Sequence, residues 1–368
     1  MSPLARYMLR ETLRPTLAAL LVTTFLLLTT QLLRIGEAAF GYGLTFLDFS
    51  LILALLLPRF FVFTLPIAVL IGVGSGLGRL ADDREIMAME ALGTSPLSMW
   101  GGPAVLGLGA ATLALGLTVF GEPWALRGLS ERLARVVEKN LVQGIEPGII
   151  HEEIPGLVIY ARDRHEVTGL KDVFLRIQRS GSEATVVAES ARIVPTGRHG
   201  LSLEMRAGEL LDSAPDDQGD PSLTRVAFDR GTITIDIDRT VRRRVRFIGE
   251  LDTLDTPSLA AAARDDRDPE AACKAETMLH RRFVIPGACL ALALLAVPLG
   301  IGRALRSGRK KGLAFVLGVA AVLLFFSGLR MAESVACSLV LPIPLTLWIP
   351  NLLAAGVAIF ALRKRAGR

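Results

Sequence analysis

The stretch GRLADDREIMAMEALGTSP, from Gly78 to Pro96, interrupts two long apolar segments. The residues before it, LPIAVLIGVGSGL, and those after it, MWGGPAVLGLGAATLALGLTVF, carry no charged side chain. Because an unpaired charge is costly in lipid, a chain that crosses a membrane must leave the hydrocarbon here and then enter it again. The interruption therefore predicts two membrane-spanning helices joined by a short polar segment.

Apolar residues gather in blocks along the rest of the chain as well. Of the 368 residues, 51% are hydrophobic and 21% are charged. The blocks are residues 15–33, 50–80, 97–121, 283–302, 312–329 and 345–362. Each is close to the ~20 residues that cross a bilayer as a helix, so six spans are expected. The first block could also be a secretory signal, but its apolar core is longer than that of a usual signal, which favours an uncleaved span.

Basic residues mark one side of the predicted membrane. They are Arg6, Arg10, Arg14, Arg79, Arg84, Arg303, Arg306, Arg309, Lys310, Lys311, Arg363, Lys364, Arg365 and Arg368. The short loops on the other side hold only Arg34 and Arg330. Positive flanks stay in the cytoplasm, so both termini are expected inside and residues 122–282 outside. The net charge of +5 thus reflects topology and argues against a nucleic-acid-binding protein.

Residues 122–282 lack long apolar blocks, which predicts a soluble domain inserted between the spans. A helical pattern covers EPWALRGLSERLARVVEKN, and from Gly148 the apolar period changes to two. Leu201, Leu203 and Met205 alternate with polar residues, as do Ile233, Ile235 and Ile237. The fold class predicted is an α-helical membrane protein with six transmembrane helices, three before and three after an inserted antiparallel β-jelly-roll domain. Its parts are residues 1–121, 122–282 and 283–368.

Motifs for enzymatic chemistry are missing from the sequence. HEEIP at His151–Pro155 lacks the second histidine of a zinc-protease motif, and no lysine follows a glycine as in a phosphate-binding loop. Cys273, Cys289 and Cys337 form no CxxC pair and are expected to be small apolar fillers without a disulfide framework. We expect no enzyme, no metal site and no cofactor in this chain.

Local signals in the opening stretch predict a short cytoplasmic helix at about 82–93. Asp82 can cap its N-terminus and Glu85 can complete a capping box, while Gly93 can end it. Glu85 either only caps this helix, or it shares one face with Met89 and Leu92, with Ile86 near the edge of that face, and this apolar stripe docks into a partner's groove. Both interpretations of Glu85 are open at this point.

The segment LPIAVLIGVGSGLGRLADDREIMAMEALGTSP resembles the LptF/LptG (YjgP/YjgQ) family of lipopolysaccharide export permeases. That family has a glycine-rich second span and then an acidic helix, whose pattern matches Glu85, Ile86, Met89, Ala91, Gly93 and Ser95. The segments LHRRFVIPGACLALALLAVPLG and WIPNLLAAGVAIFAL are similar to its fourth and last spans. The amino-terminal segment is more similar to the LptF-type subunit. One departure is Glu90, which lies where the family often has an arginine.

The resemblance implies a noncatalytic permease subunit of an ABC transporter in the bacterial inner membrane. Such a subunit extracts lipopolysaccharide and passes it to a periplasmic bridge. The implied partners are an LptG-like sister permease, an LptB-like ATPase dimer and LptC-like and LptA-like jelly-roll proteins. ATP and magnesium would belong to the ATPase, and nucleic acid is not expected. The short helix would be the coupling helix, with Asp83, Arg84, Glu85, Ile86, Met89 and Glu90 against the ATPase.

Two arginines and one sheet face are candidates for substrate contact. Arg34 is either an interfacial anchor or a cation for lipid phosphate. Arg59 lies in an apolar stretch and needs a partner, which can be a substrate phosphate, Glu37 or Asp48. Arg330 and Glu333 share a helical face and can pair with each other. In the insertion, Leu201, Leu203, Met205, Ile233, Ile235 and Ile237 either line an acyl-chain slot or fill a core.

A second function class fits some of these features. A membrane-anchored scaffold or mechanotransmission protein could bind a protein partner through the outer β domain. Six glycine-rich spans are more than an anchor requires, which favours the permease.

Overall fold

The computed structural model describes residues 3–42, 46–144, 147–154, 157–165, 169–179, 182–196, 200–215, 221–236, 249–265, 267–301, 311–338 and 341–366. The chain divides into two compact units. The membrane unit comprises residues 1–32, 56–125 and 251–368, and the sheet unit comprises residues 33–55 and 126–250.

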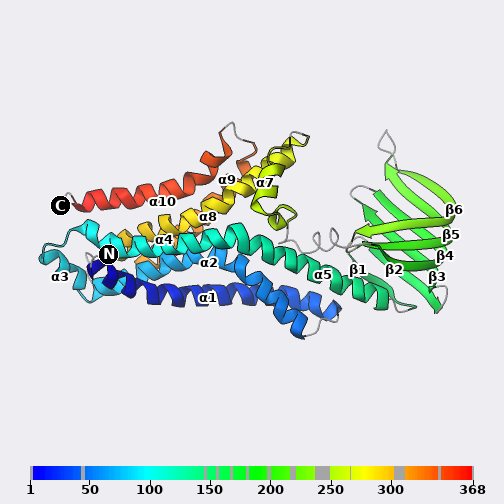
Figure 1. Cartoon of the computed structure of the whole chain (residues 1–368), viewed down its shortest axis with the longest axis horizontal. Helices are drawn as coiled ribbons and strands as arrows, with labels where there is room; N and C mark the ends of the chain where they lie inside the picture. The colour runs from blue at the N-terminus through cyan, green and yellow to red at the C-terminus, as the bar shows by residue number, and fades with distance from the viewer. Residues whose placement is uncertain are drawn as a thin grey trace. The chain divides into compact units, whose positions relative to one another are not determined.

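The helices follow the apolar blocks of the sequence (Figure 1). They are α1 (Pro3–Tyr42), α2 (Phe46–Asp82), α3 (Glu85–Ala91), η1 (Pro96–Trp100), α4 (Gly101–Gly116), η2 (Leu117–Gly121), α5 (Glu122–Gly144), η3 (Leu251–Thr253), α7 (Thr256–Ala262), α8 (Pro269–Ile301), α9 (Lys311–Val335) and α10 (Ile343–Ala366). Six stretches in the described part of the chain are long and apolar enough to cross a membrane, which confirms the predicted count. The third runs through α4, η2 and α5, where η2 is one turn of π-helix.

Helix α8 is the centre of the membrane unit. It packs against α4, α10, α9 and α7, and most of its inward side chains are buried. Pro286 and Pro298 lie inside it, and each removes a backbone N–H from the helical hydrogen-bond series. The carbonyl of Arg282, four residues before Pro286, instead accepts a 2.8 Å bond from Thr118 Oγ1 in η2. A side chain of the third span thus donates the hydrogen bond that Pro286 cannot donate within the fourth span.

Glycines bring α1 close to its neighbours. A Cβ added to Gly72 would overlap Thr16, and one added to Gly76 would lie 2.7 Å from the Glu11 carbonyl oxygen. At Gly102 of α4 an added Cβ would lie 2.6 Å from Cβ of Met8, whose side chain is fully buried. Small residues therefore allow the backbones of α1, α2 and α4 to touch.

The sheet unit contains six antiparallel strands that follow one another in chain order. They are β1 (Ile150–Ile154), β2 (Leu157–His165), β3 (Gly169–Arg179), β4 (Ser182–Thr196), β5 (Gly200–Pro215) and β6 (Pro221–Asp236). The predicted antiparallel sheet is confirmed. The described strands form a single meander and do not show the jelly-roll closure that was also predicted.

One row of residues interrupts the pairing of strands in this sheet. In β3 and β5 the row contains Asp172 and Ala207, whose φ values are 47° and 46°. The ladder of paired residues skips this row between every pair of neighbouring strands from β2 to β6, yet the register is the same on both sides. Val173 and Leu170 are both buried although they are three residues apart. The left-handed Asp172 therefore shifts the alternation of β3 by one, and buried side chains lie on both sides of the row.

The inner face of the sheet is apolar and packed. Its buried side chains are Ile159, Ala161, Leu170, Val173, Leu175, Val186, Ala188, Ala191, Leu203 and Met205. Leu133 of α5 packs against this cluster within the same unit. A half-buried Phe228 lies over Gly208 and Gly231, where any larger side chain would meet its ring within 3 Å.

Candidate functional site

Two parts of the membrane unit bring polar side chains together. One is α3, the short helix between the second and third spans, and the other is a charged cluster that joins α2, α5, α8 and α9. Within the membrane unit, α3 and both chain termini lie at the same end (Figure 1).

Backbone geometry separates α3 from α2. Helix α2 continues through Asp82, and Arg84 then takes a left-handed conformation with φ of 60° before α3 begins at Glu85. The predicted capping box of Asp82 and Glu85 is therefore wrong, because Asp82 still belongs to α2 and Glu85 is the first residue of α3. Leu80 and Ala81 in the last turn of α2 are buried in the core, and this burial stabilises the turn. Capping signals in the sequence contain no information about such burial.

The C-terminal end of α3 follows the sequence prediction. Gly93 has φ of 83°, its N–H bonds the Glu90 carbonyl, and the Thr94 N–H bonds the Met89 carbonyl. This pair of bonds is a Schellman motif, which uses glycine because a left-handed residue without Cβ is unstrained. Ser95 then caps η1 by accepting a hydrogen bond from the Ser98 N–H.

The side chains of α3 divide into an inner and an outer face. Of the apolar stripe predicted with Glu85, Ile86 is fully buried and Met89 packs against the same core, whereas Leu92 is exposed. The exposed apolar side chains are Met87 and Leu92, at 48% and 86% of their full exposure. Asp83, Arg84 and Glu90 are exposed, and Glu85 is half-buried.

The Glu85 carboxylate contacts α1. The Tyr7 hydroxyl donates a 2.6 Å hydrogen bond to Glu85 Oε2. One helical turn further along α1, Glu11 forms an ion pair with Arg79 at the end of α2. The partner of Glu85 in this chain is thus a tyrosine 78 residues away, which sequence reasoning missed.

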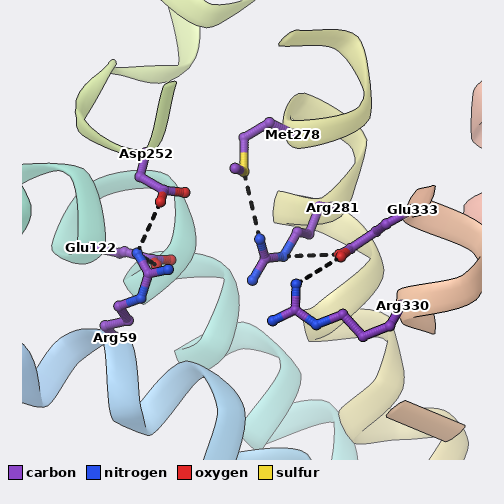
Figure 2. Close-up of polar contacts among 7 residues, drawn as sticks. All are labelled: Arg59, Glu122, Asp252, Met278, Arg281, Arg330 and Glu333. Atoms are coloured by element: carbon purple, nitrogen blue, oxygen red, sulfur yellow. Dashed lines mark hydrogen bonds and ion pairs between the residues drawn. The ribbon is translucent and has the colours of Figure 1, made fainter. Parts of the chain in front are cut away.

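Arg59 sits in the charged cluster, shown in Figure 2. Its Nη1 atom lies 3.2 Å from Asp252 Oδ2 and 3.4 Å from Glu122 Oε1, and all three side chains are largely buried. The partners found for Arg59 among the described residues are therefore two carboxylates other than the predicted Glu37 and Asp48. Asp252 belongs to η3, just after the sheet unit in the chain, so the pair ties that segment to α2.

Glu333 of α9 accepts from two arginines in the same cluster (Figure 2). Arg330 Nη1 lies 3.0 Å from one of its oxygens and Arg281 Nε lies 3.2 Å from the other. The predicted pairing of Arg330 and Glu333 is confirmed. Arg281 also stacks over Phe63 of α2, with 5.3 Å from its guanidinium carbon to the ring centroid.

Arg282, next to Arg281, is 5% exposed and holds the start of the returning segment. It donates to the Leu254 carbonyl and to Thr256 Oγ1. A small pocket beside it is lined by Thr118, Glu122, Asp252, Met278, Arg281, Arg282 and Ile285. The sequence signal for this cluster was the pair Arg281–Arg282 at the entry to an apolar run, which was noted only as part of a family motif.

A disulfide joins Cys273 in the first turns of α8 to Cys337 just after α9. The sequence prediction of no disulfide is therefore wrong, because the two helices place residues 64 positions apart at bonding distance. Cys289 is the buried thiol that was predicted. No cluster of histidine, cysteine and acidic side chains suited to a metal is found in the described part of the chain.

The remaining predicted contacts lie partly outside the described side chains. The backbone of Arg34 belongs to α1, but its side chain is not among those described. Leu203 and Met205 are buried in the sheet cluster and Ile233 packs against it. Leu201 pairs with Ile235 across β5 and β6, their side chains are outside those described, and Ile237 lies outside the described residues.

Comparison with known proteins identifies the family. A model of the family described as "Lipopolysaccharide export system permease LptF/LptG" matches residues 6–364. This chain belongs to the LptF/LptG family. It is similar to the lipopolysaccharide export system permease proteins LptF of Escherichia coli K12 and of Shigella flexneri, at 27% identity over 194 residues in each case. These matches cover 51% of this chain and 52% of each relative, so the chain spans about half the length of the curated relatives it matches.

As the chain belongs to this family, its short helix and its sheet can be described by their order among the candidate spans. The protein is a multi-pass membrane protein of the LptF/LptG family, with α3 between its second and third candidate spans and the sheet unit's strands between its third and fourth. The relatives at 27% identity carry the LptF name, in line with the LptF-type resemblance of the sequence.

Proposed function

We propose that this protein is the noncatalytic permease subunit of an ABC transporter that moves lipopolysaccharide out of the bacterial inner membrane. The observation that carries the proposal is the family match over residues 6–364. The six candidate spans, the inserted sheet and the short α3 helix support it. The domain division into residues 1–121, 122–282 and 283–368, with a coupling helix at about 82–93, belongs to this proposal.

The proposed orientation has the α3 end in the cytoplasm and the sheet unit in the periplasm. Basic flanks at Arg79, Arg84 and the chain termini favour a cytoplasmic location. The Cys273–Cys337 disulfide supports this orientation independently, because disulfides form in oxidising compartments. Cys273 lies near the start of α8 and Cys337 follows the end of α9. The basic segment 302–311 joins the other ends of these two helices, so it is expected on the other side of the membrane.

The proposed energy source is a separate cytoplasmic ATPase. In this proposal α3 is the coupling helix, and ATP and magnesium are bound by the ATPase subunit. Asp83, Arg84, Met87, Glu90 and Leu92 are exposed in or directly beside this helix, and Glu85 is half-buried. The burial of Ile86 and Met89 supports a structural role for them, in which they fasten α3 to the membrane core. A sister permease and periplasmic jelly-roll proteins complete the proposed assembly.

The proposed substrate contacts are Arg34, Arg59 and the apolar face of the sheet. Arg59 is already paired with Glu122 and Asp252. A lipid phosphate at Arg59 would have to displace one of these carboxylates, so we infer that such a contact is made only in part of the transport cycle. Leu203 and Met205 are packed within the sheet cluster, so acyl chains would have to part that cluster to enter.

Copurification and crosslinking test this function. The Glu85→Arg variant is expected to insert normally in the membrane and to recover at least fivefold less ATPase, because a cation replaces the carboxylate that meets it. Photo-crosslinkers at Ile233 and at Phe228 are expected to trap lipopolysaccharide only when ATP is present. Undiminished ATPase recovery would remove Glu85 from the contact. A periplasmic protein partner recovered without lipid would favour the scaffold in place of the permease.

A further inference from the structure

The hydrogen bond between Tyr7 and Glu85 connects the first span to the short helix. It joins two side chains near the surface, with Tyr7 at 38% of its full exposure and an O···O distance of 2.6 Å. A hydrogen bond from a neutral hydroxyl to a carboxylate is short and about twice as strong as one between two neutral groups. It therefore restricts the Glu85 side chain more than packing alone does.

The part of α1 that carries Tyr7 is fixed to the rest of the membrane unit. Its next residue, Met8, is fully buried against Gly102 of α4, and Glu11 pairs with Arg79 at the end of α2. Gly76 of α2 lies against the Glu11 backbone. Tyr7 consequently stands on a backbone that is held from two sides, and it provides a fixed point for a group on α3.

The other end of the bond is an element with few anchors of its own. Helix α3 has seven residues, begins after a left-handed residue and is attached to the core through Ile86 and Met89. The Tyr7 hydroxyl bonds Oε2 of Glu85, so Oε1 remains for a second donor. The exposed side chains of Met87, Glu90 and Leu92 belong to the same seven-residue helix and its end.

We propose that Tyr7 is a positioning residue, which holds the Glu85 carboxylate so that its second oxygen is presented to a cationic side chain of the ATPase subunit. The same bond makes α1 and α3 move together when the ATPase displaces α3. This inference rests on the proposed function, in which α3 meets the ATPase. It assigns to α1 a direct part in the coupling that no local sequence pattern predicts.

The test uses the Tyr7→Phe variant in the full-length permease. This change removes only the hydroxyl, so the packing of α1 is kept. The affinity for the cytoplasmic ATPase subunit of the same organism, measured by titration of labelled ATPase onto the permease in nanodiscs, is expected to fall about fivefold. Tyr160→Phe in β2 is the matched control, and it is expected to leave that affinity unchanged.

A double variant separates positioning from a general structural effect. In a Glu85→Ala background Tyr7→Phe is expected to change ATPase affinity by less than twofold, because the group that it positions is gone. An equal fivefold loss in both backgrounds would overturn the inference and would leave the proposed function intact. Unchanged affinity in Tyr7→Phe alone would do the same. Failure of the unsubstituted permease to bind the ATPase would overturn the proposed function itself and the inference with it.

Discussion

Arg84 lies between the end of the second span at Asp82 and the start of the short helix at Glu85. Its φ of 60° is in the left-handed region, which is unfavourable for a residue with a Cβ by about 1 kcal/mol. The Arg84 N–H bonds the Ala81 carbonyl, and the Ala88 N–H bonds the Arg84 carbonyl. The residue thus ends one helix and starts the next within a single turn. Its backbone and its exposed guanidinium can be tested separately.

Arg84→Gly is expected to keep the turn and remove the charge. Glycine adopts positive φ without strain, so the melting temperature in detergent should change by less than about 2 °C. Arg84→Val should lower the free energy of unfolding by about 1–2 kcal/mol, because a β-branched residue is the least suited to this conformation. If the guanidinium meets the ATPase, Arg84→Gly should lower ATPase recovery at an unchanged melting temperature. Equal melting of the Gly and Val variants would contradict the assigned strain.

Sequence reasoning at this scale succeeded where the signal is local. Gly93 and Ser95 were assigned to the end of one helix and the start of the next because their roles depend on their own φ angle or hydroxyl. Asp82 was misassigned because burial of the preceding turn extends α2 past a good capping residue. Arg59 was recognised as a charge in need of a partner, but its partners Glu122 and Asp252 are far away in the chain.

At the scale of elements, a hydroxyl in the third span supplies the hydrogen bond that a proline removes from the fourth span. Pro286 cannot donate to the Arg282 carbonyl, and Thr118 Oγ1 does so at 2.8 Å from a fully buried site. The π-helical turn η2 brings Thr118 to that position. Such turns are often found where a helix departs from regular bonding to serve a specific contact. Buried polar groups of this kind fix which faces of two apolar helices meet.

Thr118→Val should therefore destabilise the membrane unit. Valine has nearly the same shape but no hydroxyl, so the Arg282 carbonyl loses this donor at a cost of about 1–2 kcal/mol. Thr112→Val is the matched control, because the Thr112 hydroxyl donates to the Leu108 carbonyl of its own helix and is exposed. Thermal unfolding in detergent should show a lower midpoint for Thr118→Val alone.

A second substitution checks the cause. Pro286→Ala restores a backbone N–H to α8, so in the Thr118→Val background it should recover part of the lost stability. In the unsubstituted background the same change should not stabilise, because the carbonyl already has a donor and the buried proline ring leaves a small cavity. Equal effects of Pro286→Ala in both backgrounds would show that Thr118 acts through packing and not through this bond.

The elements themselves were predictable because hydropathy and period are local properties. All six spans and the alternating strands follow from them, although α1 begins at Pro3 and α8 at Pro269, each more than ten residues before its predicted apolar block. The row at Asp172 and Ala207 was not predictable, since neither residue type requires positive φ. Its signature is visible only with the strands aligned: at the same row the buried positions are three residues apart, at Leu170 and Val173 in β3 and at Ala188 and Ala191 in β4.

At the scale of the molecule, a covalent bond and an ion pair both join α8 to the α9 end of the chain. The Cys273–Cys337 disulfide is one and the Arg281–Glu333 ion pair is the other. Arg281 lies two helical turns beyond Cys273, and Glu333 lies one turn before Cys337, so the two links hold neighbouring parts of the same helix pair. The sequence did not reveal this arrangement, because cysteines 64 residues apart carry no spacing signal.

Removal of the disulfide is expected to loosen this helix pair without unfolding the protein. Cys337→Ser should lower the thermal midpoint, with a loss below the ~4 kcal/mol that closing a loop of this length gives a soluble chain, because membrane spans already restrict the unfolded state. A reductant should lower the midpoint of the unsubstituted protein to the same value and leave the variant unchanged. The Cys273→Ser/Cys337→Ser double variant should match either single variant, since one bond is lost in all three. Additive losses, or a reductant effect that persists in Cys337→Ser, would mean that the two cysteines stabilise the helices separately and not through a bond to each other.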